Sequence, residues 1–380
     1  MKKTLLAAAL IVGFAGVAQA ETSVTMYGIL DTGYGYSNFK YSKDGINAKR
    51  TSSGLRGDGV FNGNRWGVRG SEDLGDGLRA IFTLEAGFDI GNGKQAQSSS
   101  TTNADRLFGR QAFVGLASDN WGSLTMGRQY NVATGFTYNN NMSVSMGDMD
   151  KAFGAQGLGS RMDNSFKYVT PSFSGFQAGV AYGNPKTTVT RVDGTDVGSS
   201  DRTNWVSTGL KYANGPLSVG ASYDRATVNG ANERNVDDAI TNWAISGAYD
   251  FEVVKLALAY GQDRHGKLGW GELGGDTGLN NSLSSDAYFQ DFKSNNYYVG
   301  LSAPVGTGTL VASWSRSDSN LDDADKLGDD AKAQNIYHLN YSYPLSKRTK
   351  VYAYGSYGTG IAYIDGLKGR EAGIGLNHQF

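Results

Sequence analysis

Apolar and polar side chains alternate with a period of two over residues 60–88, on both sides of a short turn. In the second half of this stretch, apolar residues fill every second position, and charged or small residues fill most positions between them. The apolar positions are Leu78, Ala80, Phe82, Leu84, Ala86 and Phe88. The turn has the sequence DLGDG at residues 73–77. This pattern predicts a β-hairpin with one apolar face and one charged face.

Runs of the same kind recur along the whole chain, and we expect about sixteen strands. They lie near residues 24–35, 60–71, 77–88, 105–117, 121–129, 162–170, 174–183, 202–213, 216–228, 239–251, 253–264, 292–302, 308–318, 332–343, 349–357 and 369–380. Each strand would be about nine to thirteen residues long. That length is unusual in globular proteins and suits strands that cross a membrane at a tilt.

The connections between these strands alternate between short and long. Short turns such as ANGP and PLSKR contrast with long polar stretches such as residues 36–59, 130–161 and 265–291. Short turns at one end and long loops at the other are typical of an outer-membrane β-barrel. An even number of strands lets the first pair with the last, which closes the sheet and leaves no edge. The sequence therefore predicts an all-β, transmembrane antiparallel barrel.

The composition supports this fold class and excludes others. The chain of 380 residues has 54 Gly, 22 Tyr, only 5 Pro and no Cys, so no disulfide holds it together. Its mean hydropathy is −0.39, and after the N-terminal segment no stretch has the pattern of a membrane-spanning helix. No linker rich in Pro or Ser divides the chain into two domains. We therefore expect one barrel domain.

The first twenty residues have the pattern of a secretory signal peptide. Lys2 and Lys3 precede an apolar run, and Ala18-Gln19-Ala20 forms a small-residue cleavage site. An N-terminal anchor helix is the alternative, but the apolar run is short for a membrane span. We expect residues 1–20 to be removed and residues 21–380 to form the barrel. The remaining 33 basic and 36 acidic residues nearly balance, so a nucleic-acid partner is not indicated.

Motifs for catalysis or metal binding are weak. The segment GQDRHGKL at residues 261–268 nearly matches a phosphate-binding loop, but it ends on Leu where Ser or Thr is required. His265, His338 and His378 lack the spacing of metal ligands. We expect no cofactor, no metal and no catalytic set. The acidic residues 322–330 are interpreted as a solvated loop, or as a divalent-cation bridge to anionic lipid headgroups.

Six segments of the chain carry a family resemblance when they are taken together. They are VTMYGILDTG, NRWGVRGSEDLGDGLRAIFTLEAGF, GRQAFVGL, WGSLTMGRQY, RMDNSFKYVTPSFSGF and the terminal GLNHQF. These segments span essentially the whole mature chain and resemble the general diffusion porins of the betaproteobacterial and neisserial type. The resemblance implies a sixteen-stranded barrel in the Gram-negative outer membrane, a homotrimer, and a third long loop folded into the pore.

The charged face of the first hairpin contains the first candidate pore residues. With DLGDG as the turn, Arg65 is expected roughly opposite Glu85, and Arg69 and Arg79 share that face. A simple cross-strand ion pair is one interpretation of Arg65 and Glu85. The other is that Arg65 lines the narrowest part of the pore and Glu85 orients it, because lumen charges there set selectivity.

The resemblance implies further constriction residues. The constriction arginines of the family correspond to Arg65, Arg110 and Arg161, and the acid on the barrel wall corresponds to Glu85. The third loop should supply a carboxylate that faces them, and Asp148 is a better candidate than Asp150. Arg128 is interpreted either as a pore residue or as an anchor of this loop.

Aromatic residues near strand ends are interpreted as girdles at the two membrane surfaces. They are Tyr34, Tyr36, Trp121, Trp205, Trp243, Trp314, Tyr354 and Tyr357. A row of rings that guides sugars through the lumen is the competing interpretation.

The expected function is passive diffusion of small hydrophilic solutes and ions through a water-filled channel, with moderate anion preference. Expected partners are outer-membrane lipid and a homotrimer of this chain. A channel specific for sugars or carboxylates is the main alternative. An outer-membrane enzyme would need a catalytic set, and a soluble secreted β-protein would purify without detergent.

Overall fold

The computed structural model describes residues 22–43, 45–97, 106–152, 159–183, 189–192, 195–199, 202–229, 239–268, 287–288, 292–320 and 332–380. The expected signal peptide and the acidic residues 322–330 lie outside the described residues.

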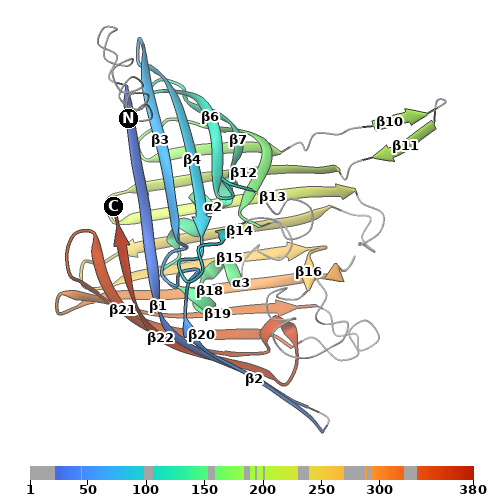
Figure 1. The fold of residues 1–380 in the computed structure, drawn as a ribbon, viewed down its shortest axis with the longest axis vertical. Coiled ribbons are helices and arrows are strands. Elements are labelled where there is room, and N and C mark those ends of the chain that lie inside the picture. Colours follow the sequence, from blue (N-terminus) through green and yellow to red (C-terminus); the bar gives the residue numbers. More distant parts are fainter. Residues whose placement is uncertain are drawn as a thin grey trace, which may run out of the picture.

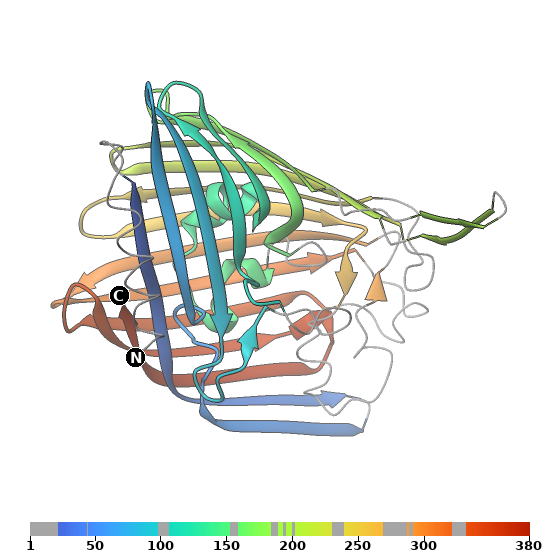
Figure 2. The ribbon, with the colours of Figure 1, turned by 45° about the horizontal axis from the view of Figure 1, so that its top comes forward.

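Within these residues, sixteen antiparallel strands form a closed barrel (Figures 1 and 2). They are β1 (Ser23–Lys43), β3 (Arg65–Gly75), β4 (Leu78–Phe88), β6 (Gln111–Ser118), β7 (Gly122–Tyr130), β8 (Arg161–Val169), β9 (Phe176–Gly183), β12 (Arg202–Asn214), β13 (Leu217–Asn229), β14 (Ile240–Asp250), β15 (Lys255–Arg264), β18 (Lys293–Val305), β19 (Gly308–Ser319), β20 (Gln334–Pro344), β21 (Thr349–Thr359) and β22 (Leu367–Gln379). The barrel closes because β1 pairs with β22 from Ile29 to Tyr41. The expected sixteen strands and the closed sheet are confirmed.

Smaller elements lie in the connections. β5 (Gln95–Ala96) pairs with β4, β10 (Val189–Val192) with β11 (Thr195–Ser199), and β16 (Lys267–Leu268) with β17 (Ala287–Tyr288). The short helices are α2 (Val132–Phe136), η1 (Tyr138–Asn140), η2 (Ser145–Gly147), α3 (Met149–Ala152) and η3 (Ile361–Tyr363). No helix in the described part of the chain is long and apolar enough to cross a membrane.

The first strand is much longer than expected. β1 continues to Lys43 and turns at Gly45 into β2 (Ile46–Leu55), where the sequence had suggested an irregular loop over residues 36–59. Ten residue pairs join β1 to β2. Phe39 and Tyr41 continue the alternation of the strand, and their side chains pack against the buried cluster around Ile361, which extends β1 beyond its expected end.

The register of the first hairpin also differs from the expected one. Arg65 pairs with Gly87, and Glu85 pairs with Gly67, so Arg65 and Glu85 are not opposite each other. The turn is shorter than DLGDG, because Asp76 and Gly77 both have positive φ and the pairing shifts between Asp73 and Gly75. A two-residue Asp-Gly loop matches the twist of paired strands better than a five-residue turn does.

The wall is apolar outside and polar inside. Large apolar side chains such as Phe166, Leu258 and Leu339 are exposed on the outer face. Polar side chains from the alternate positions, such as Asn242 and Ser246 of β14, are buried inside. This arrangement is the reverse of a soluble barrel and is expected where lipid surrounds the wall.

Two of the expected girdle aromatics point inward instead. The Trp205 side chain is 7% exposed, and its indole Nε1 donates to Asp224 at 2.9 Å. Tyr354 is 6% exposed and packs against Val144 in the lumen. A position near a strand end does not determine whether a side chain faces the lumen or the lipid. The alternation of side chains along the strand determines it. Tyr34, Tyr36, Trp121 and Trp243 are exposed, as a girdle requires.

Candidate pore constriction

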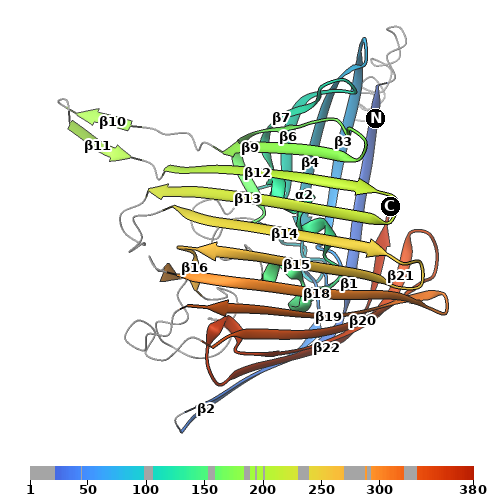
Figure 3. The same ribbon diagram turned by 180° about the vertical axis from the view of Figure 1, so that it is seen from behind.

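The connection between β7 and β8 folds into the barrel, as expected for the third loop (Figure 3). Asn131 caps α2, because its side chain accepts the backbone N–H of Thr134 at 3.0 Å. Val132 and Phe136 of α2 then pack on the inner wall formed by β9, β12 and β13. Glycine is required on β13 at Gly220, where a Cβ atom would lie 2.2 Å from the carbonyl oxygen of Phe136.

Hydrogen bonds fasten this loop along the next part of the wall. Thr137 donates to Ser222 of β13 at 2.8 Å, and Asn140 donates to Ser246 of β14 at 2.9 Å. The Tyr298 hydroxyl of β18 accepts the backbone N–H of Met142 at 3.2 Å. The loop is therefore held strand by strand, and it narrows the lumen on this side.

Glu371 of β22 holds the middle of the same loop, at η2. Its carboxylate accepts the hydroxyl of Ser145 and the backbone N–H of Met146, both at 2.9 Å. The attachment points thus run from β9 to β22 along the inner wall. The strands on the opposite side, β3, β4, β6 and β7, take no part in these contacts.

A second inward segment, residues 56–64 between β2 and β3, is organised around Asp31. This carboxylate is 0% exposed and accepts three successive backbone N–H groups, from Val60 at 2.8 Å, Phe61 at 3.3 Å and Asn62 at 3.1 Å. It also accepts the Tyr352 hydroxyl and the Asn377 amide, both at 2.7 Å. Five donors satisfy the buried charge and fix the segment that leads into Arg65.

Two of the expected arginines meet at one tyrosine. Arg110 donates to the Tyr130 hydroxyl at 2.7 Å, and Arg161 donates to the same oxygen at 2.6 Å. The Arg161 guanidinium carbon also lies 4.5 Å from the centre of the Tyr130 ring. Arg110 directly precedes β6, Arg161 starts β8 and Tyr130 ends β7, so three neighbouring strands position this group.

Arg65 lies beside the same group. Its Nε donates to the carbonyl oxygen of Gly63 at 2.9 Å, and it is within electrostatic range of Arg110 and Arg161. A Cβ atom at Gly63 would lie 3.3 Å from Arg110 Nη1 and 4.0 Å from Arg65 Nη2, so both guanidinium groups approach this glycine. We call Arg65, Arg110, Arg161 and Tyr130 the arginine cluster.

Glu85 is paired with Arg110 rather than with Arg65. Its Oε1 lies 2.7 Å from Arg110 Nε, and its Oε2 accepts the Tyr27 hydroxyl at 2.9 Å. Both members of the ion pair are almost completely buried. The expectation that Glu85 orients Arg65 is therefore wrong in its partner. The hairpin register places Glu85 two residue pairs away from Arg65. Glu85 pairs with Gln111 of β6 instead, and this pairing brings Arg110 next to its carboxylate.

The other expected pore residues lie in different surroundings. Arg69 stacks on the Tyr27 ring with its guanidinium carbon 5.4 Å from the centroid. Arg79 pairs with Asp119 at 2.8 Å in the exposed turn after β6, at the rim with the short connections. Asp148 accepts the Asn141 amide at 2.6 Å within the third loop.

Arg128 anchors chain segments. Its Nε donates to the carbonyl oxygen of Gly109 at 2.7 Å, and its Nη1 lies 2.5 Å from Asp163. These contacts fix the segment before β6 to β7 and β8. They match the anchoring interpretation of Arg128, although the segment held is not the third loop.

Sequence reasoning missed two residues next to the arginine cluster. Tyr130 ends the WGSLTMGRQY segment as the last residue of β7, and only its position between β6 and β8 shows its role. Lys167 of β8 donates to the Tyr130 carbonyl oxygen at 3.1 Å. Its inward parity, shared with Ser165, could have identified it. In the part of the chain described here, no group of three or more His, Asp or Glu side chains is placed to hold a metal ion.

Comparisons with known proteins match this architecture. A family model described as Gram-negative porin matches residues 7–360. An outer membrane porin protein of Bordetella pertussis is 42% identical over 405 residues, covering 100% of both chains. Outer membrane porin protein 32 of Delftia acidovorans is 33% identical, covering 93% of this chain and 88% of that protein.

A solved structure has the same fold. An anion-selective porin from Comamonas acidovorans superposes with a TM-score of 0.64 at 25% identity, covering 95% of this chain and 100% of that chain. The closed barrel, the lipid-suited outer face and the inward third loop agree with these matches. The chain therefore belongs to the Gram-negative porin family of outer-membrane channels.

Proposed function

We propose that this porin passes small hydrophilic solutes and ions by passive diffusion, with moderate anion preference, and that the arginine cluster forms its constriction. The observation that supports this most directly is the position of three arginines on one wall of a lumen that the third loop narrows from the other side. Fixed charges at the narrowest point of a water-filled pore set which ions enter.

The balance of charge around the cluster favours anions. The cations on this wall are Arg65, Arg106, Arg110, Arg128, Arg161 and Lys167, and the acids in contact with them are Glu85 and Asp163. Six positive and two negative charges leave an excess of four positive charges. Glu85 is also buried against Arg110, so it offers little to a passing cation.

One solved structure agrees with this direction of selectivity. The Comamonas structure is named as an anion-selective porin, and the fold and length of the two chains correspond. We extend that property to this chain because its own arginines supply the charge. The acid that opposes the cluster from the third loop is proposed to be Asp148.

A channel with a preferred carboxylate solute is the second candidate. Guanidinium groups bind carboxylates through paired hydrogen bonds, and two of them share the Tyr130 hydroxyl here. Such a channel would show saturable conductance block by one class of solute. A general porin would show proportional dependence on concentration.

We further propose that the mature chain begins at Glu21 and assembles as a homotrimer. The mass of the protein extracted from outer membranes tests the first proposal. A chain that retains residues 1–20 would contradict it.

Conductance in a planar bilayer tests selectivity and assembly together. In a tenfold gradient of potassium chloride, the reversal potential should have the sign of preferential chloride permeation. Current should rise in groups of three equal steps for each inserted particle. Cation preference of the unmodified protein would contradict the charge assignment, and single independent steps would contradict the trimer.

A further inference from the structure

A row of lysines crosses three neighbouring strands at the barrel end that bears the long connections. Lys40 of β1 pairs directly with Lys49 of β2 on one side and with Lys368 of β22 on the other. Residues that face each other across an antiparallel pair project from the same side of the sheet, and like charges there repel. All three lysines are exposed. The fold thus maintains a repulsive arrangement that a bound anion would relieve.

This row faces outward, away from the lumen. The neighbours of Lys40 along the strand, Phe39 and Tyr41, pack inward against the cluster that contains Ile361 and Leu367. Because side chains alternate along a strand, Lys40 points to the opposite side. The row is therefore separate from the arginine cluster and from the path of diffusing solutes.

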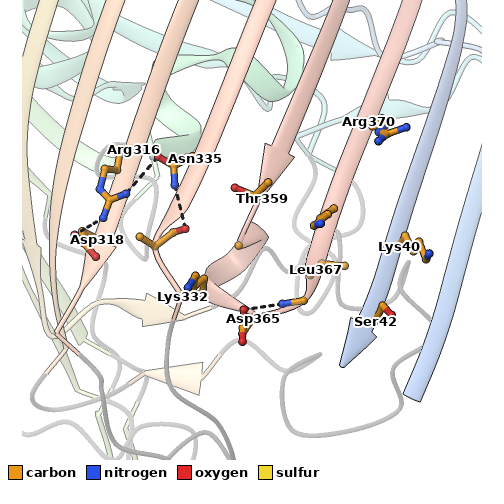
Figure 4. Close-up of a pocket in the computed structure, with 14 residues that line it drawn as sticks. Lys40, Ser42, Arg316, Asp318, Lys332, Asn335, Thr359, Asp365, Leu367 and Arg370 are labelled. Carbon is orange, nitrogen blue, oxygen red and sulfur yellow. Dashed lines mark hydrogen bonds and ion pairs between the residues drawn. The ribbon is translucent and has the colours of Figure 1, made fainter. Parts of the chain in front are cut away.

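The row borders a surface cavity of about 870 Å³, shown in Figure 4. Its lining includes five cationic side chains, from Lys40, Arg316, Lys332, Lys368 and Arg370. The two acids in the lining are already engaged, Asp318 with Arg316 at 2.8 Å and Asp365 with Lys43 at 3.3 Å. Within the described residues, Lys40, Lys332 and Lys368 form no ion pair.

An aromatic row that begins at Arg370 lies directly beneath Lys40, Lys368 and Arg316. Arg370, Tyr357, Tyr337 and Trp314 are successive cross-strand partners on β22, β21, β20 and β19, two residues farther from the rim than the row of Lys368. The Arg370 guanidinium carbon lies 5.4 Å from the centre of the Tyr357 ring. Aromatic belts mark the depth of lipid headgroups on a barrel, so the cations lie at the height of the headgroup phosphates.

We propose that this outer cavity binds the phosphate groups of an anionic lipid headgroup in the leaflet around the barrel. Lysine and arginine are the residues that hold phosphate oxygens, and the cavity offers five of them in an outward position. Because the aromatic row places the cavity at the depth of the headgroups, a lipid phosphate reaches it more readily than a dissolved phosphate. A second copy of the chain would bring like charges together at this surface, which disfavours a subunit contact here.

Lipid-selective quenching of tryptophan fluorescence tests the proposal. The full chain is reconstituted in phosphatidylcholine vesicles that contain either brominated phosphatidic acid or brominated phosphatidylcholine. Trp314 lies in the aromatic row, so bromine near the cavity quenches it. The unmodified protein should prefer phosphatidic acid. The variant Lys40→Gln/Lys49→Gln/Lys368→Gln should lose about tenfold or more of this preference, since each basic residue near a membrane surface contributes to anionic-lipid attraction.

A matched control removes the same charge from the other rim. Lys255→Gln/Lys347→Gln/Arg348→Gln changes three exposed cations at the rim with the short turns, one at the start of β15 and two between β20 and β21, and should keep the preference. An equal loss in both variants would overturn the proposal, because net charge alone would then explain binding. Displacement of phosphatidic acid by millimolar inorganic phosphate would overturn the choice of a lipid. If the triple lysine variant lost its oligomer on an unheated gel but kept its lipid preference, the lipid site would be ruled out in favour of a subunit contact.

Discussion

Replacing Arg65 and Arg161 together by alanine should lower the chloride-to-potassium permeability ratio several-fold. A unit charge about 6 Å from an ion changes its energy by about 0.7 kcal/mol even at the dielectric constant of bulk water. Each lost positive charge makes the pore less favourable for chloride and more favourable for potassium. Both effects lower the chloride-to-potassium permeability ratio, so they add. The reversal potential in a potassium chloride gradient near 0.1 M measures this, since higher salt would screen the charges.

Two control variants separate charge at the cluster from charge elsewhere. Arg79→Ala removes a cation from the rim, where it pairs with the exposed Asp119, and should leave the ratio unchanged. Arg65→Lys/Arg161→Lys keeps both charges and should retain most of the selectivity. Unaltered selectivity in the double alanine variant would mean that these side chains do not line the narrowest part of the pore.

Replacing Asp31 by alanine should destabilise the barrel by about 3–5 kcal/mol, because it removes a buried charge that satisfies five donors. Three backbone N–H groups of residues 60–62 would lose their acceptor inside the lumen. The same segment supplies the Gly63 carbonyl that holds Arg65, so anion selectivity should also fall. The temperature at which the folded band converts to the unfolded band on a gel measures the first effect.

The control for Asp31 is another carboxylate with little burial. Asp119→Ala removes an acid whose side chain is 78% exposed, and its unfolding temperature should match that of the unmodified protein. Asp31→Asn should fall between the two, since it keeps one acceptor oxygen. An unfolding temperature of Asp31→Ala equal to that of Asp119→Ala would show that residues 56–64 do not depend on this carboxylate.

The sequence predicted the positions of the strands well, but it did not predict the register in which neighbouring strands pair. Alternation identifies a strand because its period of two is local, and all sixteen expected strands are present. The register of the first hairpin depends on whether the turn closes with two residues or five. The side chains of Asp73 and Leu74 fit either choice, and only the paired backbone shows the shorter turn. The partner of Arg65 is therefore Gly87, two residues beyond Glu85, and Glu85 bonds to Arg110 instead.

The sequence by itself determined a barrel with an apolar exterior, and the resemblance indicated which arginines to expect near the pore. These properties follow from local pattern and from motif order. Only the tertiary structure revealed that Tyr130 joins Arg110 to Arg161, that Asp31 holds residues 56–64, and that Lys40, Lys49 and Lys368 form one row. Each of these groups joins residues from different strands or segments, and their proximity depends on pairing register and barrel closure, which no local pattern encodes.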